Sequence, residues 1–214
     1  MNTEFHRIAT TIAFNAMPEG FREKFLQDFS FDLLLEYVDV PYTARKFGEP
    51  EDLHLGHSYK LTLKGRDLHR AGETGALDEI VTLAKGAETL AKEGKHMLVR
   101  YNIAKGAHYI VDLGTFPHVV DGSWDKYHTK FEDQAAHWLK YNTRVIEDLV
   151  RNYSPIPMRS VQNRCRAIAE EAFFDAMDFL PTYKRNGCVT DLQWASLCCK
   201  QVYALMDWFS TFLK

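Results

Sequence analysis

The chain has 214 residues, of which 46% are hydrophobic and 26% charged, and its formal net charge is −3. This composition excludes disordered and collagen-like proteins, and the charge provides no broad attraction to nucleic acid or to an anionic membrane. The length favours a single domain, 1–214, with a core large enough to be stable without disulfides.

The N-terminal part of the chain predicts two helices followed by a long loop. Apolar residues recur at helical spacing over residues 5–17, and Pro18 ends that segment. A second helix is predicted over residues 21–37, and it ends before Pro41 because the residue preceding a proline avoids the α region. Residues 42–66 have mixed charge and no helical periodicity, so we expect a loop there, and long loops in compact domains are usually functional.

The remainder of the chain predicts five more helices, separated by glycine and proline. They cover residues 76–92, 96–113, 126–152, 159–179 and 190–212. Strand-like alternation of useful length, internal repeats and low-complexity segments are all absent from the sequence. The predicted fold class is therefore all-α.

The cysteines and the N-terminus bear on where the protein works. The four cysteines form no C-x-x-C pair, and two of them are adjacent: Cys165, Cys188, Cys198 and Cys199. Free thiols are expected, which favours a reducing compartment. Neither a signal-peptide pattern nor a run of apolar residues long enough to span a membrane is seen. We therefore expect a soluble protein of the cytoplasm.

Histidine and a carboxylate occur twice at a spacing of four residues. These pairs are His108 with Asp112 and His128 with Glu132, and His118 lies between them. Residues four apart lie on one face of a helix, and imidazole nitrogen and carboxylate oxygen are suitable zinc ligands. One such pair is more often a surface charge pair than a metal site. Two pairs flanking a third histidine, among apolar neighbours that would make unpaired polar groups costly, predict a metal centre.

These residues also carry a family resemblance. The stretch H-Y-I-V-D-L-G-T-F-P-H-V from His108, followed by Y-H-T-K-F-E-D from Tyr127, resembles the bacterial zinc-dependent phospholipase C family. That family shares its fold and its trinuclear zinc site with the single-strand-specific nucleases of fungi and plants. The similarity is concentrated between His108 and Glu132. It implies a compact multi-helix domain with the metal cluster between helices.

The resemblance draws attention to further candidate ligands nearer the N-terminus. His6 matches a zinc-binding histidine of the first helix, and Asp39 matches an aspartate ligand at the end of the second. His57 matches the histidine contributed by the long loop, with His54 as its rival. In the family the amine and carbonyl of residue 1 also bind zinc. That residue is usually Trp, whereas this sequence has Met1.

The implied cluster contains two to three zinc ions. The first ion would be held by Asp39, His57, His108 and Asp112. The second would be held by His118, His128 and Glu132. The third would be held by Met1, His6 and Asp112, so that Asp112 bridges two ions. If Met1 is not a ligand, a third ion would need residues not yet identified, with His54 and His137 next in line.

The resemblance implies a zinc-dependent phosphoric ester hydrolase, most simply a phospholipase C-like phosphodiesterase. A metal-bound hydroxide would attack phosphorus, and Asp39 would be the catalytic residue that orients the water or acts as general base. The expected substrate is a small phosphodiester or a phospholipid headgroup. One alternative is a single-strand-specific nuclease or nucleotidase, acting on single-stranded nucleic acid. Another is a non-catalytic helical protein that zinc only stabilises.

Overall fold

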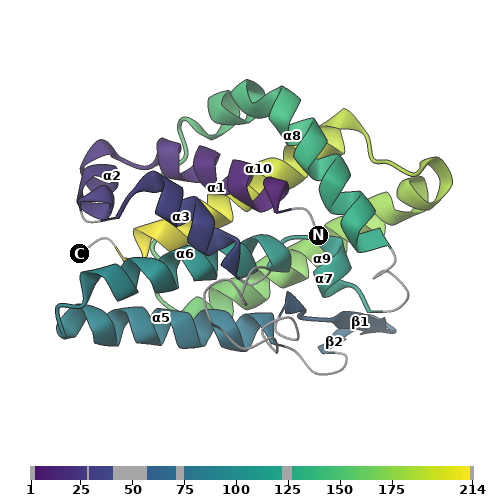
Figure 1. Ribbon diagram of the computed structural model, residues 1–214. Helices are drawn as coiled ribbons and strands as arrows, with labels where there is room; N and C mark the ends of the chain where they lie inside the picture. The colour runs from purple at the N-terminus through teal and green to yellow at the C-terminus, as the bar shows by residue number, and fades with distance from the viewer. Residues whose placement is uncertain (1–2, 28, 41–56, 71–74, 122–126, 213–214) are drawn as a thin grey trace.

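The computed structural model describes residues 3–27, 29–40, 57–70, 75–121 and 127–212. The chain is almost entirely helical in these ranges, which confirms the all-α class (Figure 1). The helices are α1 (Glu4–Ala16), α2 (Glu19–Leu26), α3 (Phe31–Val38), α5 (Ala76–Lys92), α6 (His96–Leu113), α7 (Phe116–Val119), α8 (His128–Val150), α9 (Val161–Asn186) and α10 (Asp191–Ser210). None of the described helices is long and apolar enough to cross a bilayer.

Helix α6 is the centre of the fold. It packs against α1, α3, α5, α7, α9 and α10. Every residue from Ile103 to Leu113 is buried, so this half of the helix has no solvent-facing side. A helix buried all round is normally apolar, yet Lys105, His108 and Asp112 lie within this stretch. Buried polar residues in the central helix therefore mark the place where function is to be sought.

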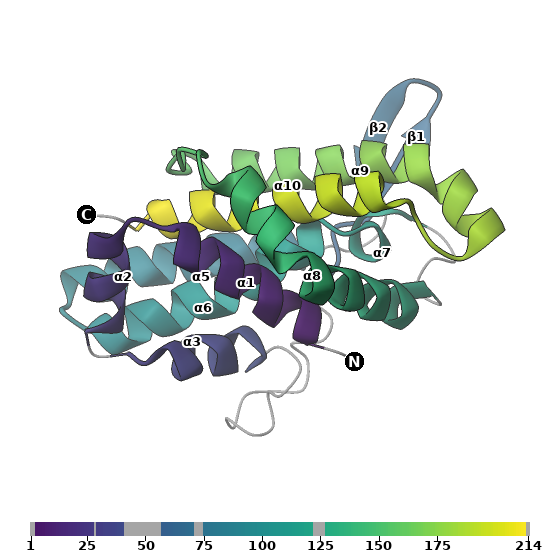
Figure 2. The same cartoon turned by 90° about the horizontal axis from the view of Figure 1, so that it is seen from above.

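Helices lie on two sides of α6. Helices α5 and α6 run side by side as an antiparallel hairpin, and α1, α8 and α10 cross on the other side of α6 (Figures 1 and 2). Helix α1 packs against both α8 and α10, so the first helix of the chain lies against the last one. Phe5, Ala9 and Ile12 of α1 are all buried in this contact region. The beginning of α1, which carries His6, is thereby brought to α6 and α8.

The prediction of one continuous helix over residues 21–37 is wrong. The structure has two helices there, α2 and α3, and the second is capped by Ser30, whose hydroxyl accepts a hydrogen bond from Leu33 N at 3.1 Å. An apolar residue recurs every fourth position through the break, so periodicity alone continues across it. The serine cap satisfies a helix-terminal N–H and starts a new helix in a new direction.

A β-hairpin occupies part of the chain that was predicted to be a loop. Strand β1 (Leu61–Lys64) pairs antiparallel with β2 (Asp67–Arg70), with Lys64 opposite Asp67. Gly65 has a φ of 67°, a conformation that suits glycine at the first central position of a two-residue turn. The hairpin projects from the helices (Figure 2). Leu61 also forms a bridge with Val120, which ties the hairpin to the end of α7.

The last three long helices were predicted approximately correctly. Helices α8 and α10 differ from the predicted 126–152 and 190–212 by two residues or fewer at each end. Helix α9 extends beyond the predicted end at 179, through Pro181 to a left-handed Gly187 at its C-terminus. Tyr183 is buried in that last part, and its hydroxyl donates to Gln134 Oε1 at 3.1 Å. Packing of this turn offsets the hydrogen bond that a proline inside a helix removes.

Candidate metal centre

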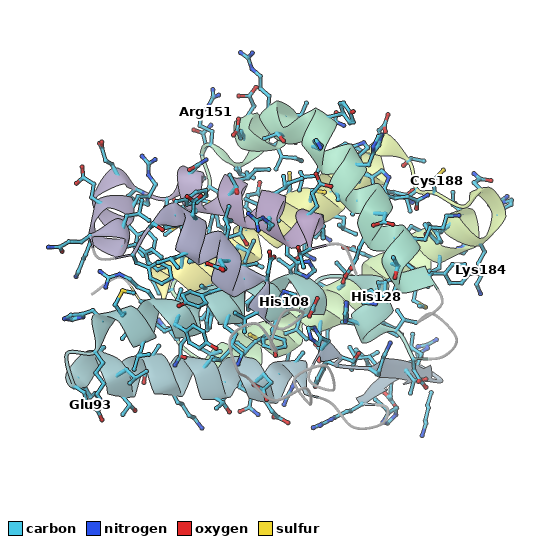
Figure 3. The ribbon with its side chains drawn as sticks, in the orientation of Figure 1. Glu93, His108, His128, Arg151, Lys184 and Cys188 are labelled. Carbon is cyan, nitrogen blue, oxygen red and sulfur yellow. The ribbon has the colours of Figure 1, made fainter. Side chains whose placement is uncertain are left out.

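Five separate segments bring the candidate ligands together. His6 comes from α1, His57 precedes β1, His118 lies in α7, and His108 and Asp112 come from α6, while α8 contributes His128 and Glu132. All of these side chains are buried except that of His128, which is 21% exposed. Figure 3 places the labelled His108 and His128 near the middle of the molecule, whereas Glu93, Arg151 and Lys184 lie at its periphery. The cluster is thus inside the protein, and only its edge at His128 is partly exposed to solvent.

Asp112 is the residue at which the segments meet. Its Oδ1 accepts a hydrogen bond from His6 Nε2 at 2.9 Å and lies 3.3 Å from His118 Nε2. Its Oδ2 accepts from His57 Nδ1 at 2.6 Å and lies 3.4 Å from His108 Nε2. Each oxygen therefore faces two imidazoles, which is the environment that a carboxylate bridging two cations would require.

A second carboxylate organises the neighbouring set. His128 Nε2 donates to Glu132 Oε1 at 2.8 Å, and His118 Nε2 lies 3.4 Å from the same oxygen. The other carboxylate oxygen of Glu132, Oε2, is buried and has no hydrogen-bond partner among the described residues. A buried carboxylate oxygen without a partner is costly, and a bound cation would remove that cost.

Among the described residues, two groups of side chains could each hold an ion, and within each group the ligand atoms lie within 4.8 Å of one another. These groups are His6 with His108 and Asp112, and His118 with His128 and Glu132. The second group is the ligand set that the sequence predicted for one ion. The first group combines residues that were assigned to two different ions, and His57 lies beside it, with Nδ1 3.3 Å from His108 Nε2.

The orientation of His108 fits metal binding. Its Nδ1–H donates to the carbonyl oxygen of Val38 at 2.8 Å, since a carbonyl can only accept. Burial lowers the pKa of His108 to about 3, so the ring is neutral and Nε2 carries a lone pair directed toward Asp112. Metal-binding histidines usually have their second nitrogen fixed in this way by a carbonyl or carboxylate. The sequence did not predict the contact with Val38, because every residue has a backbone carbonyl and no motif distinguishes this one.

The carboxylates are held ionised despite their burial. Burial opposes ionisation of Asp112, but His118, His108 and His57 outweigh it and keep its pKa well below the usual value. Burial likewise opposes ionisation of Glu132, but hydrogen bonds from His118 and His128 hold its pKa at about 2. Anionic oxygen atoms and a neutral imidazole at His108 are the protonation states that a divalent cation needs in its ligands.

Asp39 lies next to this cluster but belongs to neither ion-binding group among the described residues. Its Oδ2 accepts a hydrogen bond from Arg7 Nη1 at 2.8 Å. Burial raises the pKa of Asp39, although the hydrogen bond from Arg7 lowers it in part. Arg7 was not singled out from the sequence, although its position directly after His6 on the same helix was a usable signal.

Three other residues were candidate ligands in the sequence. Met1 and His54 lie outside the described residues. His137 is exposed on α8, with its ring 4.9 Å from that of Tyr141. His57, the preferred alternative to His54, is buried and in contact with Asp112.

The donors and their protonation thus define a buried site that can hold two cations, built from histidine and carboxylate. Comparison of the chain with models of protein families, with curated proteins and with solved structures finds no match. The function is therefore inferred from the residues of the site and their geometry.

Proposed function

We propose that the protein is a zinc-dependent phosphoric ester hydrolase, most simply a phosphodiesterase of phospholipase C type. The observation that carries the proposal is the pair of buried histidine–carboxylate groups that adjoin at Asp112. Two adjacent cations suit chemistry at phosphorus, because together they orient a phosphoryl group and stabilise its charge.

Zinc is the cation that best suits the donors. Each group has two imidazole nitrogens and a carboxylate, a ligand set found in zinc hydrolases, and the described part of the centre contains no thiolate. The same set also occurs in iron oxygenases, so the bound metal is a direct test of the proposal.

When bound, zinc would lower the pKa of a coordinated water and stabilise negative charge on phosphate oxygens. The chain itself would supply three further contributions. The Val38 carbonyl holds His108 with Nε2 toward the site. The partly exposed His128 marks the edge at which a substrate would enter. Asp39 lies beside the centre, where its carboxylate could accept a proton from the attacking water.

The substrate class rests on a single residue comparison. Glu132 occupies a position where phospholipases of the resembled family have glutamate and the nucleases tend to have aspartate. We therefore favour a small phosphodiester or a phospholipid headgroup. A nuclease or nucleotidase is the alternative within the same chemistry, and a non-catalytic zinc-stabilised protein is the alternative outside it.

One experiment separates these possibilities. The purified protein would be analysed for metals and assayed on a chromogenic phosphodiester, phosphatidylcholine and single-stranded DNA. Glu132→Gln would be compared with Glu147→Gln, an exposed glutamate on the same helix. We expect two to three zinc ions per chain and phosphodiester hydrolysis that only Glu132→Gln abolishes. Cleavage of DNA alone would indicate a nuclease, zinc without hydrolysis would indicate a structural role, and iron would contradict the proposal.

A further inference from the structure

A cavity lies at the end of α6 that is opposite to the metal centre. It is lined by α2, α5, the first two turns of α6 and residues 211–212, and its volume is about 520 Å³. Arg100 in this cavity precedes Asp112 by twelve residues, which corresponds to ~18 Å along a helix axis. Figure 1 shows α2, the turn between α5 and α6, and the C-terminus together at this end of the molecule. Small-molecule sites commonly have volumes of about 300–1,000 Å³, so the cavity is large enough for a ligand.

One part of the cavity wall is apolar. Phe21 and Phe25 of α2 line it together with Ala87 of α5, Ile103 of α6 and Phe212. Apart from Phe212, these side chains are buried in the protein core. Aromatic and aliphatic side chains of this kind favour an alkyl chain over a polar ligand.

The rest of the cavity wall has an excess of positive charge. Lys24, Lys92 and Arg100 line it together with His96, against one acidic residue, Glu88. The whole chain carries a formal net charge of −3, so this local excess runs against the overall balance. Helix α6 also begins here at His96 without a side-chain cap, and a helix N-terminus is favourable for an anion.

Arg100 is the buried cation of the cavity, with only 8% of its surface exposed. Its Nε donates to the carbonyl oxygen of Phe25 at 2.6 Å, and its Nη2 donates to that of Lys24 at 2.8 Å. These two bonds cap the C-terminal end of α2. The remaining nitrogen, Nη1, is buried and has no hydrogen-bond partner in the described part of the chain. Arg100 thus holds a buried positive charge at the wall of the cavity, and a nearby anion would offset the cost of burying that charge.

We propose that this cavity binds an unbranched alkyl carboxylate. The alkyl chain lies against Phe21, Phe25 and Ile103, and the carboxylate lies at the positive side, with Arg100 and Lys92. The positive charge of Lys24, Lys92 and Arg100 explains why the ligand is an anion, and the apolar wall explains why it needs a chain. The site is separate from the metal centre, and the proposal does not depend on phosphoric ester hydrolysis.

The test is isothermal titration calorimetry of the full chain with three compounds. Octanoate has both the chain and the charge, octanol has only the chain, and acetate has only the charge. We expect octanoate to bind at least tenfold more tightly than either of the others. Acetate also controls for a carboxylate that binds a metal ion at the distant centre. Equal affinity for octanoate and octanol, or no measurable octanoate binding at millimolar concentration, would overturn the proposal.

Two variants locate the binding. Lys92→Glu should weaken octanoate binding at least fivefold. Lys85→Glu is the matched control, because it makes the same charge change two turns earlier on α5, where the side chain does not line the cavity. That separation is ~10 Å along the helix, about one Debye length at 0.1 M salt, so the control should bind within twofold of the unchanged protein.

Arg100→Gln tests the buried cation, with circular dichroism to follow whether α2 stays folded. A tenfold loss of octanoate affinity in a folded variant would support the role of Arg100. If Arg100→Gln does not fold, the Lys92 and Lys85 variants still decide the matter, because equal losses in those two would place the ligand elsewhere.

Discussion

At the residue scale, Asp112 contacts more histidines than any other described side chain of the metal centre. Histidines from α1, from the segment before β1, from α6 and from α7 all lie within 3.4 Å of its two oxygens. Glu132, by contrast, is in contact with histidines from α7 and α8 only. The two carboxylates are equally buried, so they differ in how many segments of the chain contact them and not in exposure.

Asp112→Asn should therefore remove more metal than Glu132→Gln. An amide cannot supply the anionic oxygen Oδ1 of Asp112, which lies against His6 of one group and His118 of the other, whereas loss of Glu132 removes a ligand from one group. We expect the Glu132 variant to lose about one ion per chain and the Asp112 variant to lose two. Metal content after dialysis, measured by inductively coupled plasma mass spectrometry, gives the answer. Equal losses would show that Asp112 does not bridge.

A buried aspartate outside the metal centre has a structural role. Asp207 accepts hydrogen bonds from Tyr153 Oη and Ile156 N, both at 2.8 Å, and from Arg164 Nη2 at 3.2 Å. These bonds fix the connection between α8 and α9 against α10. Burial, together with the hydrogen bond to Asp207, raises the pKa of Tyr153, so the phenol keeps its proton and remains a donor.

Asp207→Asn should destabilise the fold by about 1–3 kcal/mol, because it replaces a charged acceptor of several hydrogen bonds with a neutral one. Urea denaturation followed by circular dichroism measures the change. Asp178→Asn, at an exposed position on α9, is the control and should change stability by less than ~0.5 kcal/mol. Similar stabilities for the two variants would mean that the connection is held by other contacts.

At the scale of elements, the approach of α10 to α6 depends on a glycine. A Cβ atom built on Gly106 would lie 2.3 Å from Trp208 Cζ2, and Trp208 is fully buried with its Nε1 donating to Ile103 O at 2.8 Å. The indole ring is rigid, fully buried and fixed by this hydrogen bond, so it has little room to move. The smallest residue at position 106 thus allows the two helices to pack closely.

Gly106→Ala should lower stability by about 1–3 kcal/mol, even though alanine is the better helix former by about 1 kcal/mol. Overpacking outweighs propensity at this site because the neighbour is an aromatic ring. Gly20→Ala in α2 is the matched control, since a Cβ there meets nothing within 4 Å. The control should be neutral or more stable. Thermal unfolding of both variants tests this, and stabilisation of Gly106→Ala would refute the packing argument.

A glycine that directly follows the apolar pattern marked two helix ends in the sequence. Gly94 and Gly114 gave the ends of α5 and α6 to within two residues. The break between α2 and α3 was missed because Phe25, Phe29 and Leu33 continue the apolar spacing across it, and Ser30 was the cue that was overlooked. The β-hairpin was missed because each strand has only four residues, too few for the alternation of Leu61 and Leu63 to predict a strand.

The candidate site contains ligands that the sequence spacing predicted and ligands that it did not. His108, Asp112, His128 and Glu132 form local pairs on helices, and their spacing alone predicted that they lie together. His6 and His57 are 106 and 55 residues from Asp112 in sequence, so no local pattern connects them, and only the family resemblance pointed to them. The contact of Asp39 with Arg7 also spans distant segments, and the sequence did not predict it.

At the scale of the whole molecule, the metal centre joins the helices that form the core. Its ligands come from α1, α6, α7 and α8, so an ion bound there would resist the separation of these helices. Binding to the folded state alone converts metal affinity into folding stability.

Removal of metal should therefore lower the melting temperature. Free metal at a hundred times its dissociation constant stabilises by about 2.7 kcal/mol, which corresponds to ~5–10 °C for a chain of this size. Thermal unfolding would be compared before and after treatment with a chelator, and again after zinc is restored. A melting temperature unaffected by the chelator, in protein shown to have lost its metal, would contradict a link between the centre and the fold.

The contact between His6 and Asp112 also has a consequence for how the chain folds during synthesis. The two residues are separated by 106 positions, and α1 is further covered by α8 and α10, which are made later still. At about 5–20 residues per second, a ribosome needs ~5–20 s to reach Asp112 after His6 has been made. For that time α8 and α10, the helices with which α1 makes most of its contacts, have not been made, so α1 would emerge with much of its apolar surface uncovered. An ion held by both ligand groups would be captured only after Glu132, the last of these ligands in the sequence, has been made.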